Sequence, residues 1–297
     1  MDITIHDTTL QIHRLDARRV KDLELLHTAV YGQPPEKGMY PKKYDTAFTG
    51  QAYLGFIAYA SDGTPAAYYG VIPCFISYGD KTLLAAQSAD TMTHPLYRKK
   101  GLFILLARQT YDLCRQVGVR LLFGFPNQNS YHTFVNSLGW TATDRMDLFI
   151  LPVRYALPFS VIRNSHAQTG IPNSVQNEGF GGVHRDEAYL RYKTYRPSVV
   201  KKAGGACVWF RAGASLLVGD VTFKPEQWDA MIAALMKRAR LLASKSISFQ
   251  ACPGTLLHTQ LFQRYTPQPS FPIITMDLDA GIPMGQLKFT FADIDIF

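Results

Sequence analysis

The stretch that decides the expected fold is Thr93-His94-Pro95-Leu96-Tyr97-Arg98-Lys99-Lys100-Gly101-Leu102-Phe103. It follows a predicted strand, Leu83–Thr93, and leads into a predicted helix, Lys99–Val117. A strand that passes through Arg-x-x-Gly into a helix presents backbone N–H groups at the positive end of a helix dipole, and such a helix start binds a diphosphate. Gly101 lets a ligand approach the backbone closely, and the three basic residues before it add positive charge.

Alternating strands and helices are predicted around this stretch. A strand, an amphipathic helix and a short helix with a loop come first, and three strands joined by tight turns follow. A buried strand, a short helix and a further strand come after the Lys99–Val117 helix. The predicted segments are Thr9–His13, Asp16–Tyr31, Pro34–Phe48, Ala52–Ala60, Ala66–Tyr78, Leu83–Thr93, Val119–Phe125, Asn129–Ser137 and Asp147–Val153.

Composition narrows the class of protein. The chain has 297 residues, of which 47% are hydrophobic and 18% charged, as in an ordinary globular protein long enough for two domains. No apolar run approaches the ~20 residues of a membrane helix, and the N-terminus lacks the pattern of a signal peptide, so we expect a cytoplasmic protein with no membrane partner. The four cysteines are far apart in apolar segments, which predicts buried thiols and no metal site.

The net charge of +8 implies an affinity for anions. The basic residues are scattered apart from Arg98–Lys100, and neither an RNP-like stretch nor a helix-turn-helix pattern is present. Nucleic acid is therefore not the expected partner. A polyanionic cofactor and an ordinary solvated basic surface both remain open.

Element order and the Arg-x-x-Gly stretch together resemble the GNAT superfamily of acyl-CoA-dependent N-acyltransferases. In that family Arg/Gln-x-x-Gly-x-Gly/Ala grips the pyrophosphate of coenzyme A, and here Phe103 stands at the last position. The resemblance implies an α/β (α+β) fold with a mixed, mostly antiparallel sheet flanked by helices. It also implies that the strands before and after the motif helix splay apart to admit the pantetheine arm of acetyl-CoA.

A second unit is predicted after a linker. We expect a GNAT domain at residues 1–153, a linker at 154–185 and a degenerate GNAT-like domain at 186–297 without Arg-x-x-Gly. The predicted elements of this last domain are Ala206–Arg211, Ser215–Thr222, Pro225–Ser244, Lys245–Gln250, Gly254–Arg264, Ile273–Leu278 and Gln286–Phe291. The final residues alternate like an edge strand, with Asp293 and Asp295 on one side. The second domain would shape the acceptor pocket, as in tandem GNAT proteins.

Residues expected to hold acetyl-CoA follow from the resemblance. The backbone of Thr91, Met92 and Thr93 would pair with the pantetheine amides, and Asn127 would contact the same arm, although an Asn that caps the next helix explains this residue equally well. The pyrophosphate would be bound by the remaining residues of the motif, Arg98, Lys99, Lys100, Gly101, Leu102 and Phe103.

Candidate acid and base residues are less clearly marked. Asp90, in an otherwise apolar strand, is the candidate base, with a structural role as the competing explanation. His94 could also titrate usefully, or it could be a plain turn histidine. The family often places a Tyr acid four residues before the Gly of its Gly-Phe ending, and here that position is Val135. Tyr131 on the same helix is the candidate replacement, with a core or surface role as the competing explanation.

These residues predict an N-acetyltransferase that acts by direct attack of a primary amine, such as that of an amino sugar, on acetyl-CoA. Two alternatives stay open. One is an aminoacyl-tRNA-dependent ligase of the FemAB type, which also pairs two GNAT-like domains. The other is a non-catalytic acyl-CoA-binding module.

Overall fold

The computed structural model describes residues 2–5, 8–154 and 170–297 and divides into two compact units. The first unit runs up to Phe75 and includes Leu83–Ala142 and Ile274–Gly281. The second comprises Ile76–Thr82, Thr143–Ile273 and Ile282–Phe297. In the described part of the chain, no helix combines the length and the apolar character needed to cross a membrane.

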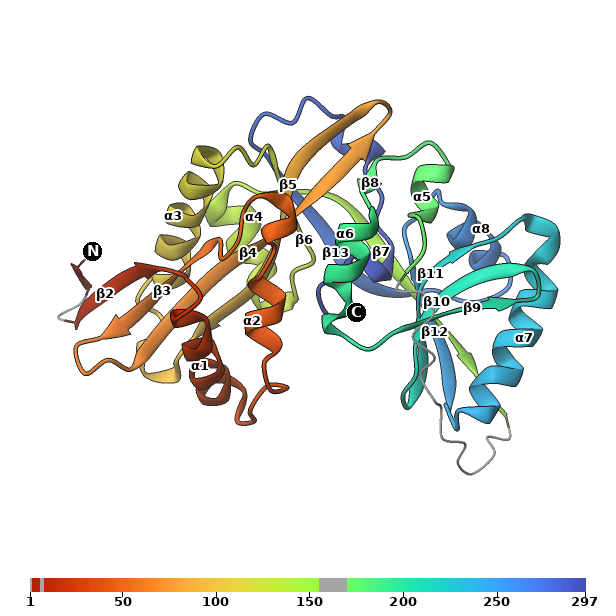
Figure 1. Ribbon diagram of the computed structural model, residues 1–297, viewed down its shortest axis with the longest axis horizontal. Helices are drawn as coiled ribbons and strands as arrows, with labels where there is room; N and C mark the ends of the chain where they lie inside the picture. The colour runs from red at the N-terminus through yellow and green to blue at the C-terminus, as the bar shows by residue number, and fades with distance from the viewer. Residues whose placement is uncertain (1, 6–7, 155–169) are drawn as a thin grey trace. The chain divides into compact units, whose positions relative to one another are not determined.

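The first unit is built on a sheet in the order β1-β2-β3-β4-β5-β6, with part of β13 beside β6 (Figure 1). Strands β5 and β6 are parallel, whereas β1 to β4 pair antiparallel in sequence and β13 pairs antiparallel with β6. The strands are β1 (Asp2–Ile5), β2 (Thr8–Arg14), β3 (Gly55–Ala60), β4 (Pro65–Tyr78), β5 (Lys81–Thr93), β6 (Leu121–Gly124) and β13 (Gln268–Asp277). The helices are α1 (Asp22–Tyr31), α2 (Met39–Tyr44), α3 (Leu102–Gln116) and α4 (Gln128–Leu138).

Helices cover both faces of this sheet (Figure 1), and two successive residues of β4 identify the helix on each face. The ring of Tyr68 meets Tyr44 of α2, with centroids 5.6 Å apart, and the ring of Tyr69 meets Tyr111 of α3 at 5.8 Å. Neighbouring residues of a strand point to opposite faces, so α2 lies on one face and α3 on the other. Burial on both faces explains the nearly continuous apolar sequence of β4.

Helix α3 begins at Leu102, and the prediction of a helix from Lys99 is wrong at its start. Lys99 and Gly101 have φ angles of 62° and 73°, in the left-handed region that a right-handed helix excludes. Gly101 serves as the N-cap residue. The extra residues belong to the loop that precedes the helix.

The second unit contains a smaller sheet in which β9, β10 and β11 form an antiparallel meander, β12 pairs parallel with β11, and β7 pairs antiparallel with β12. Strand β8 pairs with Ile76–Ser77 of β4. The strands are β7 (Thr141–Pro152), β8 (Gly182–Val183), β9 (Val199–Ala203), β10 (Ala206–Arg211), β11 (Ser215–Thr222) and β12 (Ser246–Ala251). The helices are α5 (Ser174–Asn177), α6 (Glu187–Tyr192), α7 (Trp228–Leu241) and α8 (Leu256–Phe262).

Part of the predicted linker, residues 155–169, lies outside the described residues, and residues 170–185 include α5 and β8. The predicted strand Asp147–Val153 is longer than expected and begins at Thr141. Of the four cysteines, all free thiols, Cys207 alone is partly exposed and the other three are buried. Strand β9 and helix α6 were not predicted, because Val199–Ala203 includes two lysines and α6 spans fewer than two turns.

The last residues do not form the predicted strands at Gln286–Phe291 and beyond. They make short 3₁₀ turns at Met284–Gln286 and Phe291–Asp293. Side chains from elsewhere in the second unit satisfy the backbone carbonyls that a neighbouring strand would otherwise bind. These donors are Lys193 to Ile294 at 2.9 Å, Tyr195 to Asp295 at 2.8 Å and Arg211 to Ile296 at 2.8 Å.

The aromatic ring of Phe297 lies at the point where β11 and β12 separate. The ladder between these parallel strands ends at Val218 and Phe249, and β11 continues to Thr222. A Cβ atom added to Gly219 would lie 2.2 Å from the Phe297 ring, so the glycine makes room for it. Phe297 is 1% exposed and meets Trp209 edge to face at 5.5 Å.

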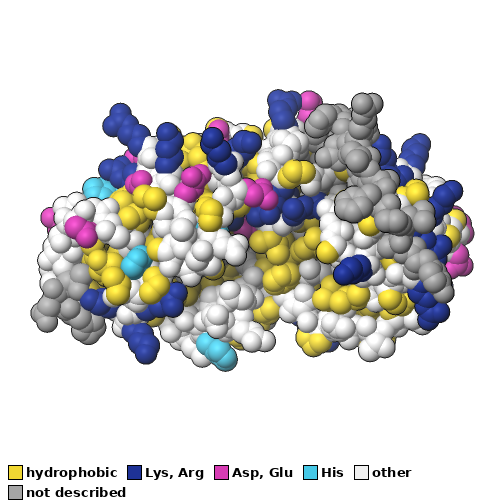
Figure 2. Space-filling view, turned by 90° about the horizontal axis from the view of Figure 1, so that it is seen from below, with side chains coloured by type: hydrophobic (Ala, Val, Ile, Leu, Met, Phe, Trp, Pro, Cys, Tyr) yellow, Lys and Arg dark blue, Asp and Glu magenta, His cyan; other side chains and the backbone are white. Residues whose placement is uncertain are grey.

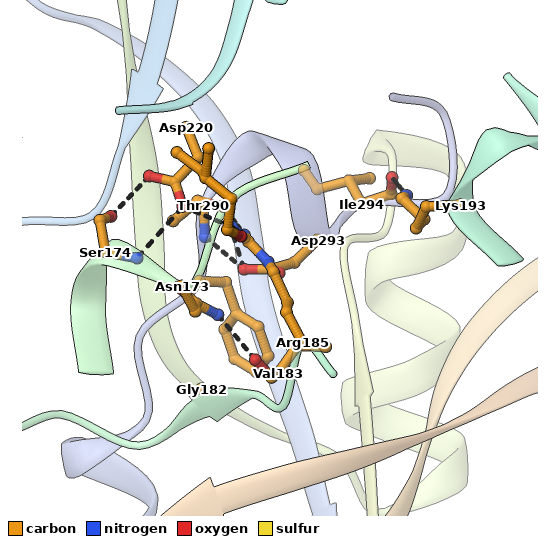
Figure 3. Close-up of polar contacts among 12 residues, drawn as sticks. Asn173, Ser174, Gly182, Val183, Arg185, Lys193, Asp220, Thr290, Asp293 and Ile294 are labelled. Carbon is orange, nitrogen blue, oxygen red and sulfur yellow. Dashed lines mark hydrogen bonds and ion pairs between the residues drawn. The ribbon is translucent and has the colours of Figure 1, made fainter. Parts of the chain in front are cut away.

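A buried ionic network anchors this segment (Figure 3). The guanidinium of Arg185 donates to Asp220 at 2.5 Å and to Asp293 at 2.8 Å, and all three side chains are fully buried. Ser174 donates to Asp220, and Arg185 also donates to Thr290. Asp293, predicted to lie on the exposed side of an edge strand, is therefore one of the anchors of the buried C-terminal residues.

Replacing Arg185 with Met should lower the free energy of unfolding by about 3–5 kcal/mol, because two buried carboxylates lose their cation. Chemical denaturation followed by circular dichroism measures this loss. The matched control is Arg191→Met, which removes the exposed i,i+4 pair with Glu187 and should cost about 0.5 kcal/mol or less. Equal effects of the two substitutions would contradict the anchoring role of Arg185.

Candidate active site

The central feature of the first unit is the early end of the ladder between β5 and β6. Paired residues run from Ala85 with Leu121 to Ser88 with Gly124. Strand β6 ends there, whereas β5 continues to Thr93. Residues 89–93 of β5 thus extend beyond the last residue paired with β6, and the predicted Thr91, Met92 and Thr93 all lie in this extension. An extended molecule with amide groups could pair with the backbone of such a strand edge.

Beyond β5 the chain makes a hydrogen-bonded loop before α3. His94 accepts a hydrogen bond from the Leu96 N–H at 3.3 Å and so caps the turn Pro95–Tyr97. The Nε atom of Arg98 donates to the Thr93 carbonyl at 3.3 Å, which ties the loop back to the end of β5. His94 thus has the structural turn role that was one of its two sequence interpretations.

The N-terminus of α3 has the features of an anion site. Gly101 has no side chain to cap the first N–H groups, and apart from its neighbours along the chain no described residue has an atom within 4 Å of the position its Cβ would take. Arg98 and Lys99 are exposed beside it, and the ammonium of Lys100 lies 5.9 Å from the Tyr97 ring centre. Free N–H groups, open space and neighbouring cations together favour a phosphate group.

Phe103 departs from the family motif because its side chain serves the core. Its ring packs against Tyr69 at 5.7 Å and Phe134 at 5.2 Å. Leu102 is 2% exposed and belongs to the same core. Because both side chains are turned toward the core, the backbone N–H groups of this first turn can still serve a ligand. The motif's small residue is therefore not required for the anion site.

Asp90 lies on β5 with its carboxylate toward α2. Its Oδ2 atom accepts a hydrogen bond from Tyr44 at 2.7 Å and is 2.8 Å from the Lys43 ammonium. The Lys43 side chain is only 3% exposed and that of Asp90 is 19% exposed. Burial, followed by the negative charge of Asp90, raises the pKa of Tyr44 well above its ordinary value, so the phenol keeps its proton and remains a donor.

Asn127 begins α4 as an N-cap. Its side-chain oxygen accepts hydrogen bonds from the N–H groups of Asn129 at 3.0 Å and Ser130 at 3.1 Å. The capping explanation of this residue is thereby confirmed. Its amide NH₂ group takes no part in these bonds, so contact with the pantetheine arm stays a prediction.

Tyr131 lies on α4, partly buried against the core, with its ring 5.8 Å from that of His132. The two side chains that bind Asp90, the predicted base, both come from α2. Among the described residues, no hydrogen bond links Asp90 to Tyr131, the predicted acid. The role of Tyr131 as the acid stays a prediction.

Sequence reasoning missed the residues of α1 and α2 that surround Asp90. Lys43 and Tyr44 bind its carboxylate. The ring of Tyr40 stacks on that of Tyr44 with centres 6.3 Å apart, and the Tyr40 hydroxyl oxygen lies 2.7 Å from Nδ1 of His27. Tyr40 and Tyr44 lie in the segment Pro34–Phe48, which was predicted as a short helix with a loop. Their spacing of four residues on a helix was the available signal, since it places both rings on one face.

The basic charge of the chain is dispersed on the face shown in Figure 2. Lys and Arg side chains stand at many separate points, with acidic side chains among them. This arrangement agrees with the scattered basic residues of the sequence.

Comparison with known proteins agrees with this geometry. Residues 11–143 match the family model of the acetyltransferase (GNAT) domain. No curated protein matches the chain.

Several solved structures share the fold. A probable N-acyltransferase from Enterococcus faecalis V583 is 14% identical with a TM-score of 0.65, over 92% of this chain and 73% of that one. A GCN5-related N-acetyltransferase from Kribbella flavida is 13% identical with a TM-score of 0.64, over 91% and 71%. A putative acetyltransferase from Pyrococcus horikoshii is 12% identical with a TM-score of 0.59, over 95% and 93%.

The match and the separated β5 and β6 strands indicate the class of protein. Residues 11–143 carry a GNAT acetyltransferase domain, which supports an acyltransferase. Enzymes of this family use acyl-CoA as co-substrate.

Substitutions at Asn127 separate its two roles. Asn127→Ala should lower the free energy of unfolding by about 1 kcal/mol, because α4 loses its cap. Asn127→Asp keeps the capping oxygen and should retain stability, but it removes the amide donor and should weaken acyl-CoA binding. Denaturation and calorimetric titration with acetyl-CoA measure the two effects. Equal acetyl-CoA affinity of the wild type and Asn127→Asp would restrict Asn127 to capping.

Proposed function

We propose that this chain is an N-acetyltransferase that transfers the acetyl group of acetyl-CoA to a primary amine of a small molecule by direct attack. The observation that carries the proposal is the end of β5 beyond its ladder with β6, which leads through the Arg98–Gly101 loop to the N-terminus of α3, where Gly101 offers no side-chain cap. An extended amide-containing arm followed by a diphosphate would fit these two features in that order. Amino sugars are the first class of acceptor to test.

Each residue predicted to bind the cofactor has a role in this proposal. Thr91, Met92 and Thr93 bind the pantetheine arm through their backbone, and the Asn127 amide contributes from the start of α4. The backbone N–H groups of Leu102 and Phe103 and the charges of Arg98, Lys99 and Lys100 hold the pyrophosphate near Gly101. Asp90 lies on the α2 side of β5, where its carboxylate can attract the ammonium group of the acceptor.

We also propose that the second unit is a degenerate GNAT-like domain. Its order β9-β10-β11-α7-β12-α8-β13 repeats the order β3-β4-β5-α3-β6-α4-β7, including a parallel pair joined by a helix. Two features support the loss of cofactor binding. Phe223-Lys224-Pro225-Glu226 precedes α7 without an Arg-x-x-Gly motif, and Phe297 lies where β11 and β12 separate.

A thermal-shift titration with acetyl-CoA tests the cofactor site. Acetyl-CoA at 100 times its Kd should stabilise the wild type by about 2.7 kcal/mol. Gly101→Glu should abolish the shift, because it places a carboxylate beside the expected pyrophosphate. Release of CoA thiol in the presence of amine panels then identifies the acceptor class.

Gly118→Glu is the matched control for this experiment. Gly118 follows the other end of α3, and like Gly101 it has a positive φ, here 83°, with open space among the described residues around its Cβ position. The backbone strain of the two substitutions is therefore similar. Loss of the acetyl-CoA shift in both variants, or retention in both, would contradict the assignment of the α3 N-terminus as the pyrophosphate site.

A further inference from the structure

The Asp90 carboxylate, predicted from sequence to be the base, is engaged by fixed donors. Tyr44 and Lys43 both bind the same oxygen, Oδ2. The carboxylate is thereby held in orientation, and its side chain keeps 19% of its surface exposed, so a substrate ammonium can approach it. Such an anion is well placed to hold an ammonium group while a neighbouring neutral group takes the proton.

His27 is the neighbouring titratable group with a free nitrogen. Its Nδ1 atom lies 2.7 Å from the Tyr40 hydroxyl, and Tyr40 is fully buried. The imidazole also packs against Tyr31 of its own helix, with ring centres 4.6 Å apart. The ring is thus fixed at one nitrogen, and Nε2 is left without a partner among the described residues.

The hydrogen bonds around Tyr40 indicate the tautomer of His27. The Tyr40 hydroxyl donates to the sulfur of Met92 on β5 at 3.5 Å. A phenol has a single proton to donate, so its oxygen then accepts from Nδ1–H of His27. In this tautomer Nε2 carries the lone pair and can accept a proton.

The titratable groups around His27 come from three elements. Tyr31 lies on α1, Tyr40 and Lys43 lie on α2, and Asp90 lies on β5. Burial of the imidazole lowers the pKa of His27 from 6.5, Lys43 lowers it further, and Asp90 acts in the opposite direction. The net shift is downward, so the imidazole is neutral at pH 7 and able to act as a base.

We infer that His27 is the base that deprotonates the acceptor amine, with Tyr40 as the positioning residue that fixes its tautomer and Asp90 as the carboxylate that holds the ammonium. This inference rests on the proposed acetyltransferase function. The acceptor is an aliphatic primary amine, which is protonated at neutral pH because such amines have pKa values near 10. It must lose a proton before it can attack.

The reaction balances with these groups. The ammonium gives one proton to Nε2 of His27, and the resulting amine attacks the thioester carbonyl. The carbon–sulfur bond then breaks, the second nitrogen-bound proton leaves, and the thiolate takes up one proton to form the CoA thiol. His27 returns its proton to solvent, so one proton is released per turnover in total.

Kinetics of three variants test the assignment. His27→Gln should lower kcat by about 100-fold or more, with an unchanged thermal shift by acetyl-CoA. In the wild type, kcat/KM should fall as pH decreases through the lowered pKa of His27, below 6.5. This acidic limb should vanish in His27→Gln, and the activity deficit should narrow as pH rises toward the pKa of the amine. Tyr40→Phe should lower kcat less, and Asp90→Asn should mainly raise KM for the amine.

His132→Gln is the control, since His132 is an exposed histidine on α4. It should leave kcat and the pH profile unchanged. A His27→Gln variant with wild-type kcat, or with the acidic limb intact, would overturn the assignment of the base.

Nitrogen-15 NMR of the wild-type histidines tests the inference without turnover, and comparison with His27→Gln identifies the resonance of His27. We expect a neutral Nδ1–H tautomer at pH 7 and a titration midpoint below 6.5. A proton on Nε2 at pH 7 would overturn the inference even if acetyl transfer is demonstrated. A different outcome is that His27 has the expected tautomer and acetyl-CoA binds, but no amine is acetylated. This outcome would count against the proposed acceptor class instead.

Discussion

The early end of a parallel ladder is the constraint on which the proposed site depends. A parallel pair of strands needs a crossover connection, and α3 supplies it between β5 and β6. Because pairing stops at Ser88 and Gly124, the last residues of β5 continue without β6 beside them. The same crossover places the N-terminus of α3 immediately after the end of β5, where left-handed Lys99 and Gly101 allow the turn.

The opposite face of the first unit depends on aromatic packing over small residues. An added Cβ atom would lie 1.9 Å from the Tyr68 hydroxyl at Gly70 and 2.8 Å from it at Gly55. Glycines at these two positions therefore allow the Tyr68 ring to lie flat on the sheet. Tyr44 contacts the Tyr68 ring in a T-shaped arrangement and donates its hydroxyl hydrogen to Asp90. The position of Tyr44 in the candidate site therefore depends on the two glycines.

The second unit contains a similar arrangement of strands, in which an aromatic side chain lies between the separating strands. Its parallel pair also separates early, but Phe297 lies at the opening against Gly219. Carbonyl groups of the final residues are bound by Lys193, Tyr195 and Arg211, and Arg185 neutralises Asp293. Polar side chains satisfy this buried backbone where no neighbouring strand does so, which is why the alternating C-terminal sequence misled a prediction based on periodicity.

Local patterns in the sequence determined most of the helices and strands, the Arg98–Gly101 loop and its similarity to a pyrophosphate-binding motif, because hydrophobic period, glycine turns and helix starts depend on nearby residues. Only the tertiary structure decided that Ile274–Asp277 pairs with β6, that Lys43 and Tyr44 bind Asp90, and that His27 meets Tyr40. Each of these contacts joins segments that are far apart in the sequence. The contact is a strand ladder in the first case and a hydrogen bond or ion pair between side chains in the others. No local signal names the partner, since its identity follows from how the helices pack on the sheet.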